Sequence, residues 1–417
     1  MLVTHNPVSN PGELLKRFAD ARAESDRLFD IVRRDALYQR PIPDRHRIAF
    51  YLGHLEAFEG NLLRETVGGM PSFHPEFDRL FAFGIDPVGT ALPSDRPEDW
   101  PSPDEIHGYN QRMREQIDAR AVSDSQILNV AIEHRLMHCE TLAYMLHRLP
   151  LEQKVRPASV PRAVSSGPLQ PAMVEIAAGP VVLGLSSSST TFGWDNEFEA
   201  HSVVVPDFAI DKYKVTNGQY LDFIQSGGYQ NRAVWTAADW QWKSEQDIRH
   251  PAFWRRSNDS WRYRTMFEEI PLPLDWPVYA SHAEASAYAR WSGKKLPTEA
   301  QWQRAAQGIL TESIANADFK SWDPTPVNAF PDAQSDFGAV EMVGNGWEWT
   351  STVFAPFAGF QPFRFYPGYS ANFFDACHFV MKGGSPRTAA CMLRPSFRNW
   401  FQPHYPYVYA GFRCVSN

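Results

Sequence analysis

Two histidines four residues apart, His134 and His138, lie in a stretch with the composition of an α-helix, IEHRLMHCETLAYML. Side chains at positions i and i+4 share one helix face with Cβ atoms about 6 Å apart, so two such imidazoles can bind one cation. A third histidine, His54, lies among apolar residues in another helical stretch, YLGHLEAFEGNLL. Three imidazoles suit iron, zinc, copper or nickel and leave coordination positions open for substrates. The pattern therefore allows a metal site, although the same histidines would also fit a packed helical core.

Four amphipathic segments within residues 1–152 are predicted to be the long helices that position these histidines. The third begins with a capping box, formed by Ser102 and Glu105. Four long helices predict an up-and-down bundle in which the second and fourth helices face one core. The stretch 68–101 is predicted to be an irregular crossover, with Cys139 a small buried residue and Glu56 a surface charge.

Residues 153–172 are rich in proline and serine, lack periodicity and are predicted to link two domains. The second domain, residues 173–417, shows short strand-like runs in 173–184 and 201–216 and one clear helix in 281–293. The whole chain is therefore predicted to be α+β. In GNGWEWT, Trp347 and Trp349 are expected to pack in the core behind a tight glycine turn.

The composition excludes several classes of protein. The chain has 417 residues, 43% of them hydrophobic, and a formal net charge of −8, which argues against nucleic acid or an anionic membrane as the main partner. No apolar run reaches the ~18 residues of a membrane span, and the first residues do not resemble a secretory signal. The four cysteines form no CxxC pair. These features predict a cytoplasmic protein, monomeric or weakly dimeric, that acts on small molecules.

Motifs along the chain carry a family resemblance. GHLEAFEGNLL and IEHRLMHCETL resemble the iron-binding helices of the DinB-like domain of ergothioneine-type sulfoxide synthases. KLPTEAQWQRAA, GNGWEWT, MKGGSP and LRPSFRNWF resemble, in the same order, the formylglycine-generating-enzyme (sulfatase-modifying-factor) domain attached to it. The resemblance covers nearly the whole chain. It implies a DinB-like four-helix bundle followed by a loop-rich C-type-lectin-like domain.

The same resemblance implies a reaction and a set of site residues. The family uses non-haem Fe(II) and O2 to join sulfur or selenium to C2 of hercynine (trimethylated histidine). It implies His54, His134 and His138 as iron ligands. Asn399 and Trp400 match the family's hercynine-binding pair, and aromatic rings suit a quaternary ammonium group. Tyr366 and Tyr369 lie in the stretch that supplies a tyrosine proton donor, although both would also fit plain aromatic packing.

Two departures from the ergothioneine pattern bear on the chalcogen donor. Met137 stands where that branch has a glutamine that helps to hold hercynine. Of the two arginines that bind the donor's carboxylates, only Arg96 remains, and it follows Asp95. A doubly anionic thiol would bind poorly beside several carboxylates. The chain more closely resembles the selenoneine synthases, which implies a neutral selenosugar as donor. The alternative is an ergothioneine-type sulfoxide synthase that uses cysteine or γ-glutamylcysteine.

Two other classes of protein stay open on the sequence alone. The first is a non-catalytic binding module in which the histidines are structural. The second is a formylglycine-type oxidase, which would need copper and a cysteine pair. The scattered positions of Cys377, Cys391 and Cys414 do not favour the second class.

Overall fold

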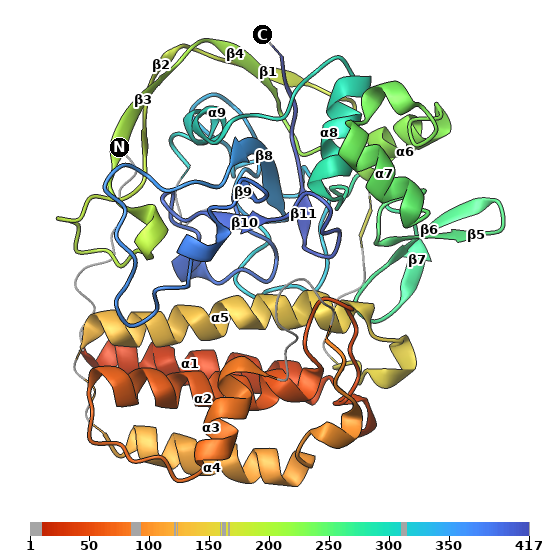
Figure 1. The fold of residues 1–417 in the computed structure, drawn as a ribbon. Coiled ribbons are helices and arrows are strands. Elements are labelled where there is room, and N and C mark those ends of the chain that lie inside the picture. The colour runs from red at the N-terminus through yellow and green to blue at the C-terminus, as the bar shows by residue number, and fades with distance from the viewer. Residues whose placement is uncertain are drawn as a thin grey trace. The chain divides into compact units, whose positions relative to one another are not determined.

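The computed structural model describes residues 11–84, 93–120, 122, 124–158, 160, 164–165, 167–309 and 315–416. They separate into a helical unit within residues 7–159 and a C-terminal unit within residues 160–417. The first contains long helices and the second contains short strands and helices in many loops (Figure 1). The predicted α+β class is confirmed. No helix in the described part of the chain is both long and apolar enough to span a membrane.

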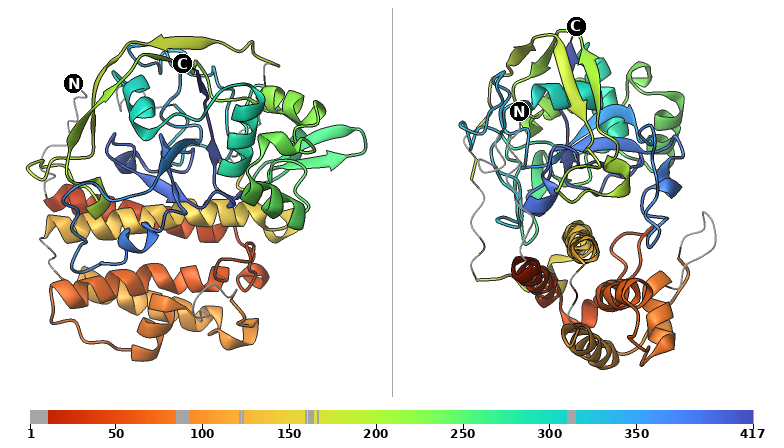
Figure 2. Two further views of the ribbon diagram at one scale, coloured as in Figure 1. Left: turned by 45° about the horizontal axis from the view of Figure 1, so that its top comes forward. Right: turned by 90° about the vertical axis from the view of Figure 1, so that its left-hand side faces the viewer.

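The helical unit contains the four predicted long helices, which Figure 2 shows nearly end-on in its right-hand view. The helix α2, which carries His54, packs against both α4 and α5. The α4 helix begins with the predicted capping box of Ser102 and Glu105. The helices of this unit are α1 (Pro11–Asp30), α2 (Ile48–Thr66), α3 (Pro75–Phe83), α4 (Pro103–Asp118) and α5 (Ser125–Arg148).

The short helix α3 lies in the stretch that was expected to be irregular, so that prediction is wrong in part. Pro75 occupies its first turn, the His74 side chain accepts a hydrogen bond from the backbone N–H of Phe77, and Gly84 ends it with φ 71°. Proline near the start and glycine after the end are ordinary helix signals. The α3 helix carries the backbone carbonyl of Phe81, whose oxygen lies 2.6 Å from Nδ1 of His54.

Predicted burial holds for one residue of the helical unit and fails for another. Cys139 has no exposed surface, as expected. Glu56 was predicted to be a surface charge, but only 1% of it is exposed. The prediction is wrong because the carboxylate accepts hydrogen bonds from the guanidinium groups of Arg114 and Arg135, which makes its burial possible.

The C-terminal unit contains four small sheets among its described residues, in the orders β1-β4-β12, β10-β9-β8-β11, β2-β3 and β5-β6-β7. An apolar core that includes Phe208, Trp302 and Met342 joins α9 to the first sheet. The strands are β1 (Met173–Ile176), β2 (Gly179–Leu183), β3 (His201–Val205), β4 (Phe208–Asp211), β5 (Trp254–Ser257), β6 (Ser260–Arg264), β7 (Glu269–Pro271), β8 (Trp347–Val353), β9 (Phe379–Lys382), β10 (Asn399–Phe401), β11 (Ala410–Gly411) and β12 (Val415–Ser416).

The described residues of this unit form four helices, of which the sequence pattern clearly indicated one. They are α6 (Asn217–Gln225), α7 (Ala237–Glu245), α8 (His282–Trp291) and α9 (Glu299–Ala305). The predicted helix is α8. The other three are short, and helices of two or three turns give little periodicity from which to predict them. Trp347 and Trp349 are buried as expected, and Gly346 has φ 132° in the preceding turn.

Acid should weaken the C-terminal unit through His282. Its ring stacks on Phe379 at 3.8 Å, and burial lowers its pKa from 6.5 to about 4. On acidification, the imidazole of residue 282 therefore binds a proton in the unfolded chain before it does so in the folded protein. The free energy of unfolding has its full contribution from the neutral ring above pH 6.5 and loses that contribution as the pH falls towards 4. The loss amounts to about 3 kcal/mol. Urea unfolding at pH 7 and pH 4.5 should show a smaller difference in His282→Gln than in wild type. The exposed residue His107 provides the control, because His107→Gln should retain the wild-type difference.

Candidate metal centre

Three imidazoles from two helices of the helical unit converge on one point. His54 comes from α2, and His134 and His138 come from successive turns of α5. Their candidate ligand atoms all lie within 4.8 Å of one another, and the Nε2 atoms of His54 and His138 are 3.2 Å apart. Two nitrogens bound in cis positions to one ion, with bonds of about 2.1 Å, lie about 3 Å apart. The observed separation therefore suits a shared metal ion.

The orientation of His54 is set by α3. Its Nδ1 atom lies 2.6 Å from the backbone carbonyl oxygen of Phe81. The carbonyl can only accept, so Nδ1 carries the proton and Nε2 presents its lone pair to the other two histidines. Metal-bound histidines usually donate their second N–H in this way, which fixes the ring and makes the ligand more basic.

Aromatic rings hold two of the three imidazoles from the sides. Phe50 stacks on His54 at 4.7 Å, and Phe58 stacks on His134 at 3.4 Å. Phe50, His54 and Phe58 are spaced by four residues along α2, so they lie on one face of that helix. The rings exclude water and restrict the rotation of the imidazoles.

Burial keeps the three imidazoles neutral. It lowers the pKa of His54 to about 4 and the pKa values of His134 and His138 well below 6.5. A metal ion requires deprotonated nitrogen, so these side chains are ready to bind at neutral pH without losing protons. In a protein without metal, the N–H of His138 could instead donate to Nε2 of His54, which is the purely structural interpretation of the same contact.

No other group in the described part of the chain brings together three or more histidine, cysteine or acidic side chains in a way that could hold a metal ion. The donor set contains only nitrogen, which suits iron and other transition metals rather than magnesium or calcium. The thiols of Cys139 and Cys414 are buried, that of Cys377 is exposed, and none of the four forms a disulfide.

A glycine beside the site gives a direct test of this packing. A Cβ atom on Gly53 would lie 2.5 Å from the ring of Phe81, whose carbonyl holds His54. We expect Gly53→Ala to displace Phe81, to destabilise the protein by about 1–3 kcal/mol and to weaken metal binding. Gly108, which is exposed on α4 with nothing within 4 Å of its Cβ position, is the matched control. Gly108→Ala should stabilise the protein by up to about 1 kcal/mol and leave metal binding unchanged.

The C-terminal unit contains a second group of predicted site residues, clustered around Trp400. Its indole ring stacks on Phe354 at 4.2 Å and lies edge-on to Tyr369 at 5.4 Å and near Phe373 at 5.6 Å. The side chain of Asn399 accepts a hydrogen bond from the backbone N–H of Trp400. Trp400 is half-buried and Phe373 is exposed, and such rings provide the kind of surface that attracts a quaternary ammonium ion.

Both candidate tyrosines lie beside Trp194, but only Tyr369 touches Trp400 in the described contacts. Tyr369 stacks on Trp194 at 3.9 Å, whereas Tyr366 meets the same indole edge-on at 6.4 Å. Burial and the nearby Asp195 carboxylate raise the pKa of Tyr366 to about 12. Tyr366 therefore keeps its proton more firmly than an ordinary tyrosine, and Tyr369 is the better placed of the two against Trp400.

The crossover residues differ from what their charges suggested. Asp95 is buried and forms ion pairs with Arg40 and Arg47, so its carboxylate is neutralised. The expected repulsion between Asp95 and an anionic donor is therefore wrong. Arg96 is exposed, and its backbone N–H donates to Asp99. Met137 is half-buried on α5 beside His138.

Some supporting residues were not predicted. The carbonyl of Phe81 carries no signal in the sequence, because any residue there would present the same group. Arg135, next to His134, is 1% exposed and looks from its type like a surface charge. The spacing of Phe50 and Phe58 around His54 was the one usable signal.

Comparisons with known proteins match both units. Residues 160–417 match the family model of the sulfatase-modifying factor enzyme 1-like domain, and residues 17–142 match that of the DinB superfamily. Hercynine oxygenase of Mycolicibacterium thermoresistibile is 34% identical over 70% of this chain and 69% of its own length. Hercynine oxygenase of Mycobacterium tuberculosis is 38% identical over 56% of this chain and 58% of its own length. Ergothioneine biosynthesis protein 1 of Schizosaccharomyces pombe is 29% identical over 93% of this chain. This chain spans only 54% of that yeast relative.

Proposed function

Because this chain belongs to the family that joins a DinB-type helical domain to a sulfatase-modifying-factor domain, and that includes the hercynine oxygenases, we propose that it is an iron-dependent oxidative enzyme acting on hercynine. The observation that carries the proposal is the convergence of His54, His134 and His138 within 4.8 Å. The relatives named above modify hercynine or make ergothioneine, which supports the substrate.

The three histidines would hold Fe(II), which supplies binding positions for O2 and substrates and accepts and returns electrons. The chain's own residues prepare that centre. Phe81 fixes the tautomer of His54, Phe50 and Phe58 exclude water, and burial keeps every imidazole unprotonated. Positioning reactants in this way replaces an unfavourable encounter of several molecules by a reaction within one complex.

The aromatic cluster around Trp400 would recognise hercynine. The trimethylammonium group cannot donate a hydrogen bond, so it is bound by the negative faces of rings such as Trp400 and Tyr369. The amide of Asn399 would bind a polar group of the same substrate. The phenol of Tyr369 would supply a proton during the reaction without adding a permanent charge.

The overall reaction would replace the C2–H bond of the imidazole and the S–H bond of a donor thiol by a C2–S bond. One oxygen atom of O2 would be left on sulfur and the other in water, so that O2 accepts four electrons. We favour cysteine or γ-glutamylcysteine as the donor, because the hercynine oxygenases are among the relatives and because Asp95 is already neutralised by two arginines.

A selenosugar is the second candidate for the donor. Two features favour it. Met137, beside His138, stands where the ergothioneine branch has a glutamine. Arg96 is exposed, and the sequence lacks the second arginine that would help to bind a pair of carboxylates. With this donor the same enzyme would form a C2–Se bond.

The test is a competition assay. Protein reconstituted anaerobically with Fe(II) is given hercynine, O2 and an equimolar mixture of cysteine, γ-glutamylcysteine, a thiosugar and a selenosugar, and products are identified by mass. A hercynine–cysteine or hercynine–γ-glutamylcysteine sulfoxide supports the favoured donor, and a seleno-conjugate supports the second. Absence of any hercynine conjugate in iron-loaded protein would refute the proposed function.

A further inference from the structure

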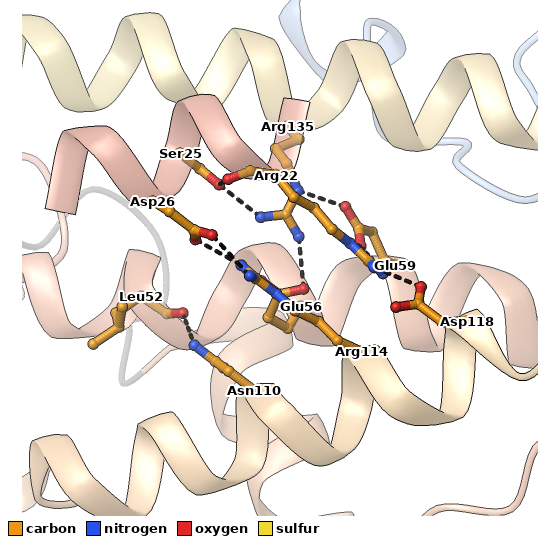
Figure 3. A network of polar contacts seen from close by, with 10 residues as sticks. All are labelled: Arg22, Ser25, Asp26, Leu52, Glu56, Glu59, Asn110, Arg114, Asp118 and Arg135. Carbon is orange, nitrogen blue, oxygen red and sulfur yellow. Dashed lines mark hydrogen bonds and ion pairs between the residues drawn. The ribbon is translucent and has the colours of Figure 1, made fainter. Parts of the chain in front are cut away.

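A group of polar and charged residues with a buried centre includes the neighbour of His134 in the sequence, and Figure 3 shows this group from close by. Its centre is Arg135 of α5, with Glu56 and Glu59 of α2; each of these side chains is 1–2% exposed. We call the whole group the Arg135 cluster; its members are Arg22, Ser25, Asp26, Glu56, Glu59, Arg114, Asp118 and Arg135.

The guanidinium of Arg135 binds two helices at once. Its Nη2 atom donates to Glu56 at 2.7 Å and its Nε atom donates to Glu59 at 2.6 Å, so it contacts α2 at two points almost one turn apart. Its Nη1 atom donates to the hydroxyl of Ser25 on α1 at 2.9 Å. A rigid planar fork with three directional contacts permits little sliding between α5 and its neighbours.

These contacts lie at the positions where sliding would matter most for the metal centre. Arg135 directly follows His134, and Glu56 lies two residues after His54. Moving α2 by a single residue along its axis shifts its side chains by about 1.5 Å, whereas metal–ligand distances tolerate only about 0.2 Å. Packing between apolar side chains is not directional enough to define the alignment of two helices to that tolerance.

Two further arginines also bind the carboxylates of Glu56 and Glu59. Arg114 of α4 donates to Glu56 and also binds Asp26 of α1, while Arg22 of α1 binds Glu59 and Asp118. A buried ion pair is not in itself a source of stability, since apolar residues of similar volume often do as well. Unlike apolar packing, the hydrogen bonds of a buried ion pair are directional, and in some proteins such groups define the alignment of helices.

We propose that Arg135 is a positioning residue that fixes the alignment of α2 with α5, so that His54 meets His134 and His138 in the geometry required by the metal. The inference rests on the proposed function only in taking these histidines as metal ligands. It does not depend on hercynine or on the donor, and binding of the metal alone can test it.

The experiment is a titration of the full-length apoprotein with Co(II), a spectroscopic stand-in for Fe(II), followed by its visible absorption bands. Arg135→Lys keeps the charge but removes the fork. We expect it to weaken Co(II) binding by about 10- to 100-fold, the usual effect of losing a residue that supports metal ligands, and to change the shape of the bands. Arg22→Gln is the matched control, because it removes a charge from the same cluster and leaves the three contacts of Arg135 intact. It should lower stability but keep the affinity and bands of wild type.

A double variant, Arg135→Met with Glu59→Met, covers the case in which Arg135→Lys does not fold. This variant removes Arg135 together with its partner Glu59 and leaves Glu56 bound to Arg114. We expect it to fold but to bind Co(II) weakly. Wild-type affinity and bands in whichever of the two variants folds would overturn the inference. So would a loss in Arg22→Gln as large as that in the Arg135 variants, because the effect would then follow stability. Wild-type protein that binds no metal would instead refute the proposed metal centre, whereas metal-binding protein without activity would refute only the reaction.

Discussion

Alanine in place of His138 should leave the protein folded but almost without iron. Four-ligand zinc sites contribute about 10–16 kcal/mol, so one ligand accounts for roughly 3 kcal/mol and its loss should weaken binding at least about 100-fold. The Nε2 atoms of His138 and His54 lie 3.2 Å apart, so the alanine removes a nitrogen from the point where the imidazoles converge. Iron content after anaerobic reconstitution and desalting is the measurement, and formation of the hercynine conjugate should fall with it.

Replacement of another histidine of the helical unit provides the control. His107 is exposed on α4, and its ring nitrogen lies 2.5 Å from the carbonyl oxygen of Pro103 in the same helix. His107→Ala should retain full iron content and activity. If His138→Ala kept about one iron per chain, the three histidines would be a structural cluster and the metal centre would have to be abandoned.

The second large effect should come from Tyr369. Removing only the hydroxyl, in Tyr369→Phe, should lower kcat at least about 100-fold, since a well-placed proton donor typically contributes that much or more. The ring and its contacts with Trp194 and Trp400 stay, so the KM for hercynine and the iron content should change little. Steady-state kinetics with hercynine varied at saturating donor would separate the two parameters.

Tyr366→Phe is the matched variant on the same loop. The ring of Tyr366 meets that of Trp194 edge-on, at 6.4 Å, and lies 5.6 Å from the ring of Tyr369. We expect its kcat to stay close to that of wild type. The opposite pattern, with the large loss in Tyr366→Phe, would assign the proton donor to Tyr366, and equal small losses would show that neither phenol takes part.

The convergence of the three histidines could be predicted in part from the sequence because helical geometry determines the spacing of two of them. Positions 134 and 138 share a face in any helix, and a bundle brings the second and fourth helices together. The structure adds the Nε2 separation of 3.2 Å between His54 and His138, which no spacing rule provides. The predicted grouping of Tyr369, Asn399 and Trp400 came from a family resemblance, since these residues are brought together only by the fold of the C-terminal unit.

The missed features share a physical cause. Glu56 and Arg135 are polar by type, and their burial depends on partners from other helices that a local pattern does not reveal. The helix α3 is short, so its start and end signals outweigh its periodicity. The compensation of the Asp95 charge likewise depends on Arg40 and Arg47, about 50 positions earlier in the chain. Long-range pairing of charges is thus the information that the sequence alone did not provide.

Every candidate ligand, and the carbonyl that orients His54, lies between residues 54 and 138, whereas the ring cluster around Trp400 belongs to the C-terminal unit. On the proposed function, the groups that would hold the metal and the rings that would bind the trimethylammonium group are therefore encoded in separate stretches of the gene. Substitutions after residue 173 would then alter the recognition of hercynine and leave the three histidines and the Phe81 carbonyl unchanged.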